Sequence, residues 1–324
     1  MAGAGAQAPT RTGRAPGAAA HGVPGINKPG GFMLTSALSS VARISLCRSG
    51  VGGLIGQAPG VRAAYGRWAL YRRNVGGVFN GCFGSWDEAM AAIPSDRLAG
   101  WDHDAAAAIF DAPLSRQPSV YASMFWLSQL LRPGDRIVDL GGGAAITHRL
   151  HTARAPLPGG VRWTVVETPA VARFGAGLVE KGDLDGVAFV DSLDAAGACD
   201  VFFSAGAMQY MPDGLATLKS ALAKRPRAIV LNKLPLAAAA DYWTLQNFGP
   251  AICPYRVWRR SDFIAAVTAQ GYVLKDAWDV AELACDIPFH PELCVRAFAG
   301  LTFVRTDLAT SQTRGDGTAP RRPR

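Results

Sequence analysis

The stretch Ile137-Val138-Asp139-Leu140-Gly141-Gly142-Gly143 decides the fold of this 324-residue chain. An apolar strand ends there next to a carboxylate, and three glycines lead into a helical segment. Glycines let a ligand approach the backbone closely, and the first turn of a helix presents unpaired N–H groups. The stretch therefore predicts a nucleotide-type cofactor site at the carboxyl edge of a sheet, or else a tight strand-to-helix turn without a ligand.

Strands and helices alternate along the chain after this point, which predicts an α/β fold with a doubly wound sheet. The predicted strands cover residues 136–140, 161–167, 187–190, 200–204, 228–232, 272–278 and 296–305. The predicted helices cover residues 118–131, 145–153, 169–180, 213–223 and 261–270, and residues 236–258 are predicted to form a long connection. Ser85 and Glu88 form a capping-box pattern that predicts a short helix from Trp86. The expected architecture is a Rossmann-like, seven-stranded, mostly parallel sheet with helices on both faces and an N-terminal helical extension.

A second carboxylate, Glu167, ends the next predicted strand 28 residues after Asp139. A carboxylate at that place can accept both hydroxyls of a ribose. Alternatively, it is only an acidic residue near a helix N-terminus at Pro169, where it complements the helix dipole. Because both carboxylates occur in this order, we favour a bound cofactor.

The acidic residue beside the glycines distinguishes between two cofactor classes. Asp139 suits the cationic amino-acid moiety of S-adenosylmethionine (SAM) better than a pyrophosphate, and the G-x-G-x-x-G spacing of dinucleotide sites is missing. The third strand ends at Asp191-Ser192, where an adenine amine would be recognised. We therefore expect SAM, and keep an NAD-dependent oxidoreductase as the weaker alternative.

Several motifs in one order add to this expectation between about Phe79 and Arg305. They are Gly81-Cys82-Phe83-Gly84-Ser85-Trp86-Asp87-Glu88-Ala89, the glycine run, Trp163-Thr164-Val165-Val166-Glu167-Thr168-Pro169, Ser204-Ala205-Gly206-Ala207-Met208-Gln209-Tyr210 and Leu231-Asn232-Lys233-Leu234-Pro235, followed by Thr244-Leu245-Gln246-Asn247, Pro254-Tyr255-Arg256 and Gly271-Tyr272. The chain thereby resembles a bacterial family of class I SAM-dependent methyltransferases that is itself mostly predicted from sequence and is sometimes met in surface-polysaccharide gene clusters. Ala145 departs from this family, which usually has a further glycine there.

The resemblance implies methyl transfer to a small-molecule or glycan acceptor, with oxygen as the expected methylated atom. The SAM-binding residues that it implies are Asp139, Gly141, Gly142, Gly143, Glu167, Thr168, Asp191, Ser192, Ser204 and Ala205. A catalytically silent SAM- or nucleotide-binding module is the alternative from another functional class.

Five residues are candidates for orienting the acceptor or accepting its proton: His148, Gln209, Tyr210, Tyr255 and His290. Gln209 and Tyr210 follow the fourth strand, and either face the substrate or pack and cap the next helix. His148 follows the glycine run but is also typical of a surface helix. Tyr255 belongs to the long connection, a natural acceptor-binding lid. His290 lines a pocket or makes a turn. Methyl transfer can also proceed by proximity to the sulfonium without any base.

The basic charge is confined to one end of the chain. The formal net charge is +8, but residues 1–86 hold nine Lys and Arg and no Asp or Glu, so the remainder carries 8 − 9 = −1. This placement argues against nucleic acid as a partner of the main domain. Residues 32–78 form a basic arm in which glycines interrupt a short apolar stripe. The arm either makes weak peripheral contact with an anionic membrane or packs on its own domain or a partner, and we favour packing.

The remaining composition completes the expected organisation. We expect disordered tails at residues 1–31 and 309–324, a helical extension at 79–135 and a SAM-binding domain at 136–308. No secretory signal and no apolar run of about 18 residues is seen. The six cysteines are scattered without a C-x-x-C pair, which predicts reduced thiols in the cytoplasm and no metal site.

Overall fold

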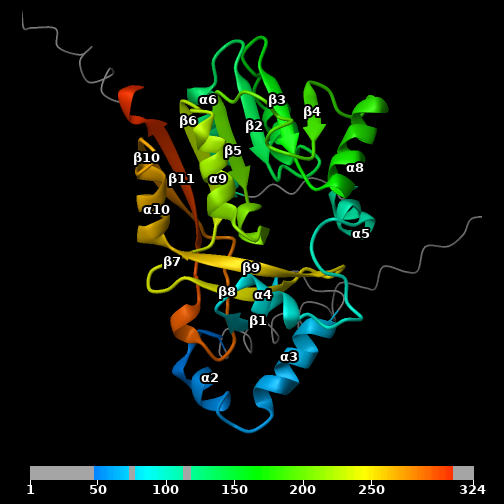
Figure 1. Ribbon diagram of the computed structural model, residues 1–324, viewed down its shortest axis with the longest axis vertical. Coiled ribbons are helices and arrows are strands. Elements are labelled where there is room, and N and C mark those ends of the chain that lie inside the picture. The colour runs from blue at the N-terminus through cyan, green and yellow to red at the C-terminus, as the bar shows by residue number, and fades with distance from the viewer. Residues whose placement is uncertain (1–46, 73–76, 112–117, 309–324) are drawn as a thin grey trace, which may run out of the picture. The chain divides into compact units, whose positions relative to one another are not determined.

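A seven-stranded sheet holds the predicted strands in the order β10-β11-β6-β5-β2-β3-β4 in the computed structural model (Figure 1). Its strands are β2 (Arg136–Leu140), β3 (Arg162–Val166), β4 (Val187–Val190), β5 (Val201–Ala205), β6 (Ala228–Leu234), β10 (Tyr272–Val280) and β11 (Phe298–Arg305). Adjacent strands from β6 to β4 pair in parallel, and β11 runs antiparallel between β6 and β10. The predicted Rossmann-like, mostly parallel sheet is therefore confirmed.

The structure describes residues 47–72, 77–111 and 118–308. The predicted disordered tails and residues 32–46 of the basic arm lie outside these ranges. Everything described belongs to one unit, Val41–Arg324. Among the described residues, no helix is long and apolar enough to cross a membrane.

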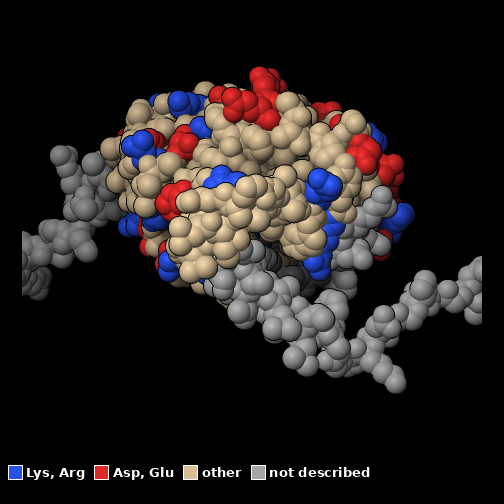
Figure 2. Space-filling view, turned by 90° about the horizontal axis from the view of Figure 1, so that it is seen from below, with Lys and Arg blue, Asp and Glu red and all other residues tan. Residues whose placement is uncertain are grey.

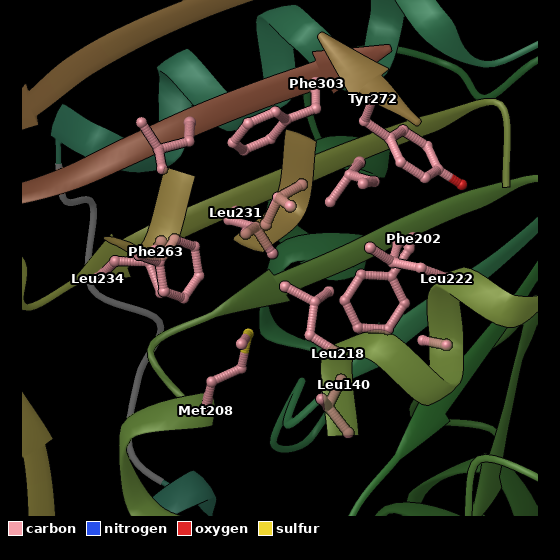
Figure 3. Packing of buried hydrophobic residues seen from close by; sticks show 14 of the residues in the cluster. Leu140, Phe202, Met208, Leu218, Leu222, Leu231, Leu234, Phe263, Tyr272 and Phe303 are labelled. Carbon is pink, nitrogen blue, oxygen red and sulfur yellow. The ribbon is translucent and has the colours of Figure 1, made fainter. Parts of the chain in front are cut away.

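Helices cover both faces of the large sheet. One face carries α6 (Pro118–Leu130), α7 (Ile146–Thr152) and α8 (Pro169–Glu180), and the other carries α9 (Gly214–Ala223) and α10 (Arg260–Thr268). Helix α8 begins with a proline at its first turn, and α9 begins where the Asp213 carboxylate accepts the Ala216 N–H at 2.8 Å. The core under α9 and α10 packs Phe202 and Leu231 of the sheet against Leu218 and Phe263 (Figure 3).

A second sheet of four strands lies next to the carboxyl ends of the large one (Figure 1). Its order is β1 (Val78–Phe83), β8 (Tyr242–Asn247), β9 (Ile252–Arg259) and β7 (Leu236–Ala237). Two expectations are corrected by it. Residues 236–258 form strands instead of a long connection, and the extension at 79–135 contains a strand and is not purely helical. Pro254 obscured β9 in the sequence, since proline is rare inside sheets, but β7 pairs only with Trp258 and Arg259 of β9.

Short helices complete the described N-terminal region. They are α2 (Gly50–Ile55), α3 (Val61–Tyr71), α4 (Trp86–Ala91), α5 (Asp104–Ala107) and the 3-10 turn η1 (Ala108–Asp111). The expected cap of α4 is present, because the Ser85 hydroxyl accepts the Glu88 N–H at 3.1 Å. The described part of the arm packs on its own domain: Arg48 forms a salt bridge with Asp286 at 2.7 Å, and Gly56 lies against Phe289.

Candidate functional site

The glycine run lies in the loop between β2 and α7, and only glycine fits its conformation. Gly141 and Gly143 have φ of +70° and +58°, in the left-handed region that disfavours side chains. A Cβ on Gly142 would lie 2.4 Å from the Asp139 carboxylate, and one on Gly143 would lie 2.5 Å from the Phe110 ring. The loop therefore brings backbone, carboxylate and an aromatic ring within contact distance.

Asp139 is a fully buried carboxylate beside this loop. Its Oδ2 accepts a hydrogen bond from the Trp163 indole at 3.1 Å, whereas Oδ1 has no hydrogen-bond partner among the described residues. Burial raises the pKa of Asp139 to about 7; the Trp163 hydrogen bond opposes this shift, and the nearby Glu167 charge adds to it. A buried carboxylate with one free oxygen is suited to receive a cationic or hydrogen-bond-donating ligand group.

Glu167 connects the loops that follow β2 and β3. Its Oε1 accepts the Gly143 N–H at 2.8 Å, and its Oε2 accepts the Thr168 N–H at 3.0 Å. Burial raises the pKa of Glu167, and these two backbone hydrogen bonds oppose that shift. The two predicted cofactor carboxylates thus lie at one edge, on either side of the glycine run.

The other predicted cofactor residues fall at the same edge but differ in their surroundings. Thr168 precedes α8, and its buried Oγ1 has no hydrogen-bond partner among the described residues. Asp191 and Ser192 follow β4 and are exposed. In contrast, the Ser204 hydroxyl is buried and donates to the Leu140 carbonyl at 2.9 Å, so it links β5 to β2. Ala205, the last residue of β5, is partly exposed.

Residues 101–111 form an aromatic wall beside the glycine run, which the sequence did not indicate. The Trp101 ring stacks with Phe110 at 6.2 Å and with Phe248 at 4.2 Å between centroids. The Asp102 carboxylate accepts the Ala170 N–H at 2.9 Å and so attaches this segment to the start of α8. The buried Trp101 Nε1 has no hydrogen-bond partner among the described residues. The wall thus connects the glycine run to Phe248, which directly follows β8.

Gln209, Tyr210 and Tyr255 are brought together by η2 (Met208–Tyr210) and β9. The Gln209 amide donates to the Tyr255 hydroxyl at 3.4 Å, and Gln209 Oε1 is buried without a described partner. The Tyr210 hydroxyl donates to the Gln246 side chain at 2.5 Å. Burial raises the pKa of both tyrosines far above the usual range, so neither phenol acts as a base near neutral pH. Tyr255 lies in the buried strand β9 and not in a loop-like connection, while its role as part of an acceptor-binding lid stays a prediction.

The two candidate histidines do not meet the glycine run. His148 turns from α7 towards Trp163, with ring centroids 5.2 Å apart, and its Nε2 lies 3.7 Å from where a Cβ on Gly186 would be. Gly186 directly precedes β4, so this is the amino side of the sheet. His290 lies 3.1 Å from Glu292 and 3.4 Å from Arg62, beside the arm. Burial and the neighbouring His151 lower the pKa of His148, which keeps its imidazole neutral.

Lys233 is a candidate that sequence reasoning missed. It lies near the carboxyl end of β6 with φ of +57°, and its stem packs on Gly206, where an added Cβ would lie 3.4 Å from Lys233 Cβ. No ion pair within 4.0 Å involves Lys233 among the described residues. Burial lowers its pKa, opposed by the charge of Glu282. Strained backbone of this kind is concentrated at functional sites.

Asn232, the residue before Lys233 on β6, forms hydrogen bonds within the protein on both sides of its amide group. Its amide donates to the Ser119 carbonyl at 3.1 Å and accepts from the Trp278 indole at 3.2 Å. It therefore attaches α6 and β10 to β6. A sequence shows polarity at a strand end but not which neighbouring side chain is already hydrogen-bonded.

Ala145, the departure from the resembled family, has φ of +54° at the N-cap of α7. A glycine would relieve this left-handed conformation, which is the physical reason for glycine there. The methyl group is fully buried in the core cluster that contains Leu127 and Ile137. It therefore packs in the protein core and does not tighten the loop around a ligand.

Comparisons with known proteins leave the function open. No protein-family model and no curated protein matches the chain. Among solved structures it is similar to a 1,6-didemethyltoxoflavin-N1-methyltransferase of Burkholderia thailandensis (TM-score 0.40, 16% identity, 66% of this chain and 98% of that one). It is also similar to a SAM-dependent methyltransferase of Aquifex aeolicus (TM-score 0.42, 12% identity, 62% of this chain and 98% of that one). A third similar structure is the [4+2]-cyclase SpnF (TM-score 0.41, 14% identity, 57% of this chain and 80% of that one). Scores and identities this low decide nothing about activity, and the fold assignment depends on the strand order itself.

Proposed function

We propose that the carboxyl edge of the large sheet binds SAM and that the protein transfers its methyl group to an oxygen of a small-molecule or glycan acceptor. The unpaired Oδ1 of Asp139 beside three glycines is the observation that carries this proposal. A buried carboxylate attracts the cationic amino group of a methionine moiety and repels a pyrophosphate, which disfavours a dinucleotide.

Each neighbouring residue has a task in this proposal. Glu167 would accept the ribose hydroxyls, Asp191 and Ser192 would meet the adenine, and the wall around Trp101 and Phe110 would exclude water. Bound SAM supplies an electrophilic methyl group on its sulfonium. The protein's part is then to hold the acceptor oxygen in line with that group, which can account for most of the acceleration.

Gln209 and Lys233 are the residues that we assign to the acceptor side. Gln209 Oε1 is free to accept a hydrogen bond from an acceptor hydroxyl. Lys233 projects from the strand beside it without an ion pair in the described part of the chain, and so can hold an acceptor oxygen that carries negative charge.

All six cysteines are free thiols, which agrees with the cytoplasmic location that we also propose.

Titration calorimetry tests cofactor binding directly. We expect the purified chain to bind SAM and its demethylated product and not to bind NAD. Gly143→Arg should abolish binding, because any side chain at that position meets the Phe110 ring. Gly177→Arg on α8 is the matched control, since a Cβ there has no neighbour within 4 Å. Unchanged affinity in Gly143→Arg, or affinity for NAD in place of SAM, would refute the site.

A silent SAM-binding module is the second candidate, because neither histidine nor either tyrosine offers a base at this edge. Incubation with methyl-labelled SAM and cell extracts separates the two functions. Label that enters a small molecule or glycan with wild-type protein, but not with Gly143→Arg, supports transfer. Tight SAM binding without any label transfer across extracts supports the silent module instead.

A further inference from the structure

Helix α2 exposes the large apolar side chains that a surface helix ordinarily buries. It buries Gly52 against the domain and exposes its large apolar residues. The exposed fractions are 58% for Val51, 67% for Leu54 and 43% for Ile55. A surface helix ordinarily turns its apolar side chains inward. The three outward aliphatic side chains therefore add nothing to the core of this domain.

Helix α3 has the same arrangement. It buries Gly66 and Ala69, while Trp68 and Tyr71 remain 45% and 46% exposed. Five of the eleven large hydrophobic residues that are exposed in the described chain thus lie on α2 and α3, which we call the α2–α3 face. A cluster of exposed apolar side chains on a monomer usually marks an interaction site.

The charge on this face is positive. Arg62, Arg67 and Arg72 of α3 and its C-cap are exposed, and the Arg72 guanidinium lies 5.0 Å from the Trp68 ring centroid. Acidic side chains also border these helices: Asp96 accepts the Tyr71 hydroxyl at 3.0 Å, Asp286 is paired with Arg48 at 2.7 Å, and Glu292 lies 3.1 Å from His290 Nδ1. Figure 2 views the molecule from the α2 and α3 end, and its central and lower described surface is tan and blue, with red side chains towards the periphery.

We propose that the α2–α3 face docks peripherally on an anionic lipid bilayer. Val51, Leu54 and Ile55 would enter the boundary between headgroups and acyl chains, where aromatic residues such as Trp68 and Tyr71 are favoured. The arginines would meet lipid phosphates, to which guanidinium groups bind strongly. A second copy of the chain fits less well, because two such faces would bring arginines of like charge together.

The helices themselves limit the kind of contact. With 6 and 11 residues, α2 and α3 can lie on a bilayer but cannot span one. Arg48 and Gly56 hold α2 to the domain through Asp286 and Phe289, so the face is presented by a fixed platform. This proposal does not depend on the methyltransferase proposal, because none of its residues lies at the glycine run.

Vesicle sedimentation with the full chain tests the docking. We expect binding to vesicles of phosphatidylcholine with phosphatidylserine, weaker binding to phosphatidylcholine alone, and release at high salt. Leu54→Ser with Ile55→Ser should lower the partition coefficient about tenfold or more by removing two inserted side chains, as should Arg67→Glu with Arg72→Glu by reversing charge. Phe125→Ser on α6, whose ring is 56% exposed, is the matched control and should bind like the wild type.

Thermal melting verifies that each variant is folded before its binding is interpreted. Absence of binding by the wild type, or equal binding to charged and neutral vesicles, would overturn the proposal. Undiminished binding of both double variants would overturn it too. A dimer in light scattering that Leu54→Ser with Ile55→Ser dissociates would show that a second copy covers the face instead.

Discussion

The two edges of the large sheet differ in how several of their polar side chains are paired. At the amino edge they are paired: Arg136 at the start of β2 binds Asp200 at 2.8 Å, and Arg227 before β6 donates to the Asp135 carboxylate at 2.8 Å. At the carboxyl edge, Asp139 Oδ1, Gln209 Oε1 and Thr168 Oγ1 are buried without a described partner. The amino edge therefore contributes stability, and the carboxyl edge keeps binding capacity that a ligand can complete.

This difference follows from the topology. In a parallel sheet the loops that can vary without disturbing pairing meet at the carboxyl ends of the strands, where ligands bind. Unpaired buried polar groups each destabilise the fold by about 1–3 kcal/mol. The buried His148 Nδ1 on the amino side also lacks a described partner, so the contrast between the edges depends on the ion pairs that only the amino edge contributes here.

The largest expected effect is at the amino edge, in Arg227→Met. The Arg227 and Asp135 side chains are only 15% and 9% exposed, and removal of the guanidinium leaves a buried carboxylate without its cation. Loss of one partner of a buried pair costs about 3–5 kcal/mol of unfolding free energy. Urea unfolding measures it. If SAM binds as proposed, its affinity should persist in the folded variant, because the glycine run lies at the opposite edge.

Arg136→Met is the control for this prediction. Its ion pair with Asp200 is 42% and 29% exposed, so its loss should cost no more than about 1 kcal/mol. Equal costs for Arg227→Met and Arg136→Met would show that burial does not distinguish these pairs. Loss of SAM binding in folded Arg227→Met would show that the two edges are coupled.

The sequence predicted the large sheet well because its signals are local. Apolar runs such as β2 and turn residues such as Pro133-Gly134 repeat along the chain, and both ends of each of the seven strands lie within two residues of the prediction. Asp139 and Glu167 could be singled out because the topology brings the ends of neighbouring parallel strands to one edge.

What the sequence missed depends on tertiary contacts. The aromatic wall exists because Trp101 meets Phe248, a residue far along the chain. The orientation of His148 is set by packing of α7 on Trp163, which a helical pattern does not specify. A glycine in a sequence suggests a positive φ, but a lysine does not. The left-handed conformation of Lys233 therefore could not be predicted.

The next largest effect comes from the titration of Asp139, which gives the carboxyl edge a pH-dependent contribution to stability. Because its pKa is about 7 in the folded state, above its ordinary value near 4, the ionised form is disfavoured in the fold. The contribution of Asp139 to wild-type stability should therefore fall as pH rises from about 4 to about 7, by an amount on the order of 3 kcal/mol relative to Asp139→Asn. In Asp139→Asn this contribution disappears, leaving the slopes of the other titrating groups, among them Glu167, whose pKa burial raises, and His148, whose pKa burial lowers.

Chemical unfolding of wild type and Asp139→Asn at several pH values measures the difference. If SAM binds as proposed, its cationic amino group favours ionised Asp139, so wild-type affinity should rise as pH increases through about 7. Asp139→Asn should lose that rise. Parallel stability curves for the two proteins would show that Asp139 does not titrate in this range and would remove the main electrostatic argument for the site.

The smallest effect concerns the strained residue of the carboxyl edge. At Lys233, φ of +57° favours glycine over alanine by about 1 kcal/mol, so Lys233→Gly should be more stable than Lys233→Ala. At Ala228, where β6 begins and φ is not positive, Ala228→Gly should instead lose about 0.5–1 kcal/mol. Thermal unfolding of the three variants measures both differences. If Lys233 holds the acceptor, Lys233→Gly should also lose methyl transfer while SAM affinity is retained. If Lys233→Gly were more stable than Lys233→Ala and as active as the wild type, the left-handed backbone at Lys233 would have no role in the reaction. Lys233 would then not be an acceptor-binding residue.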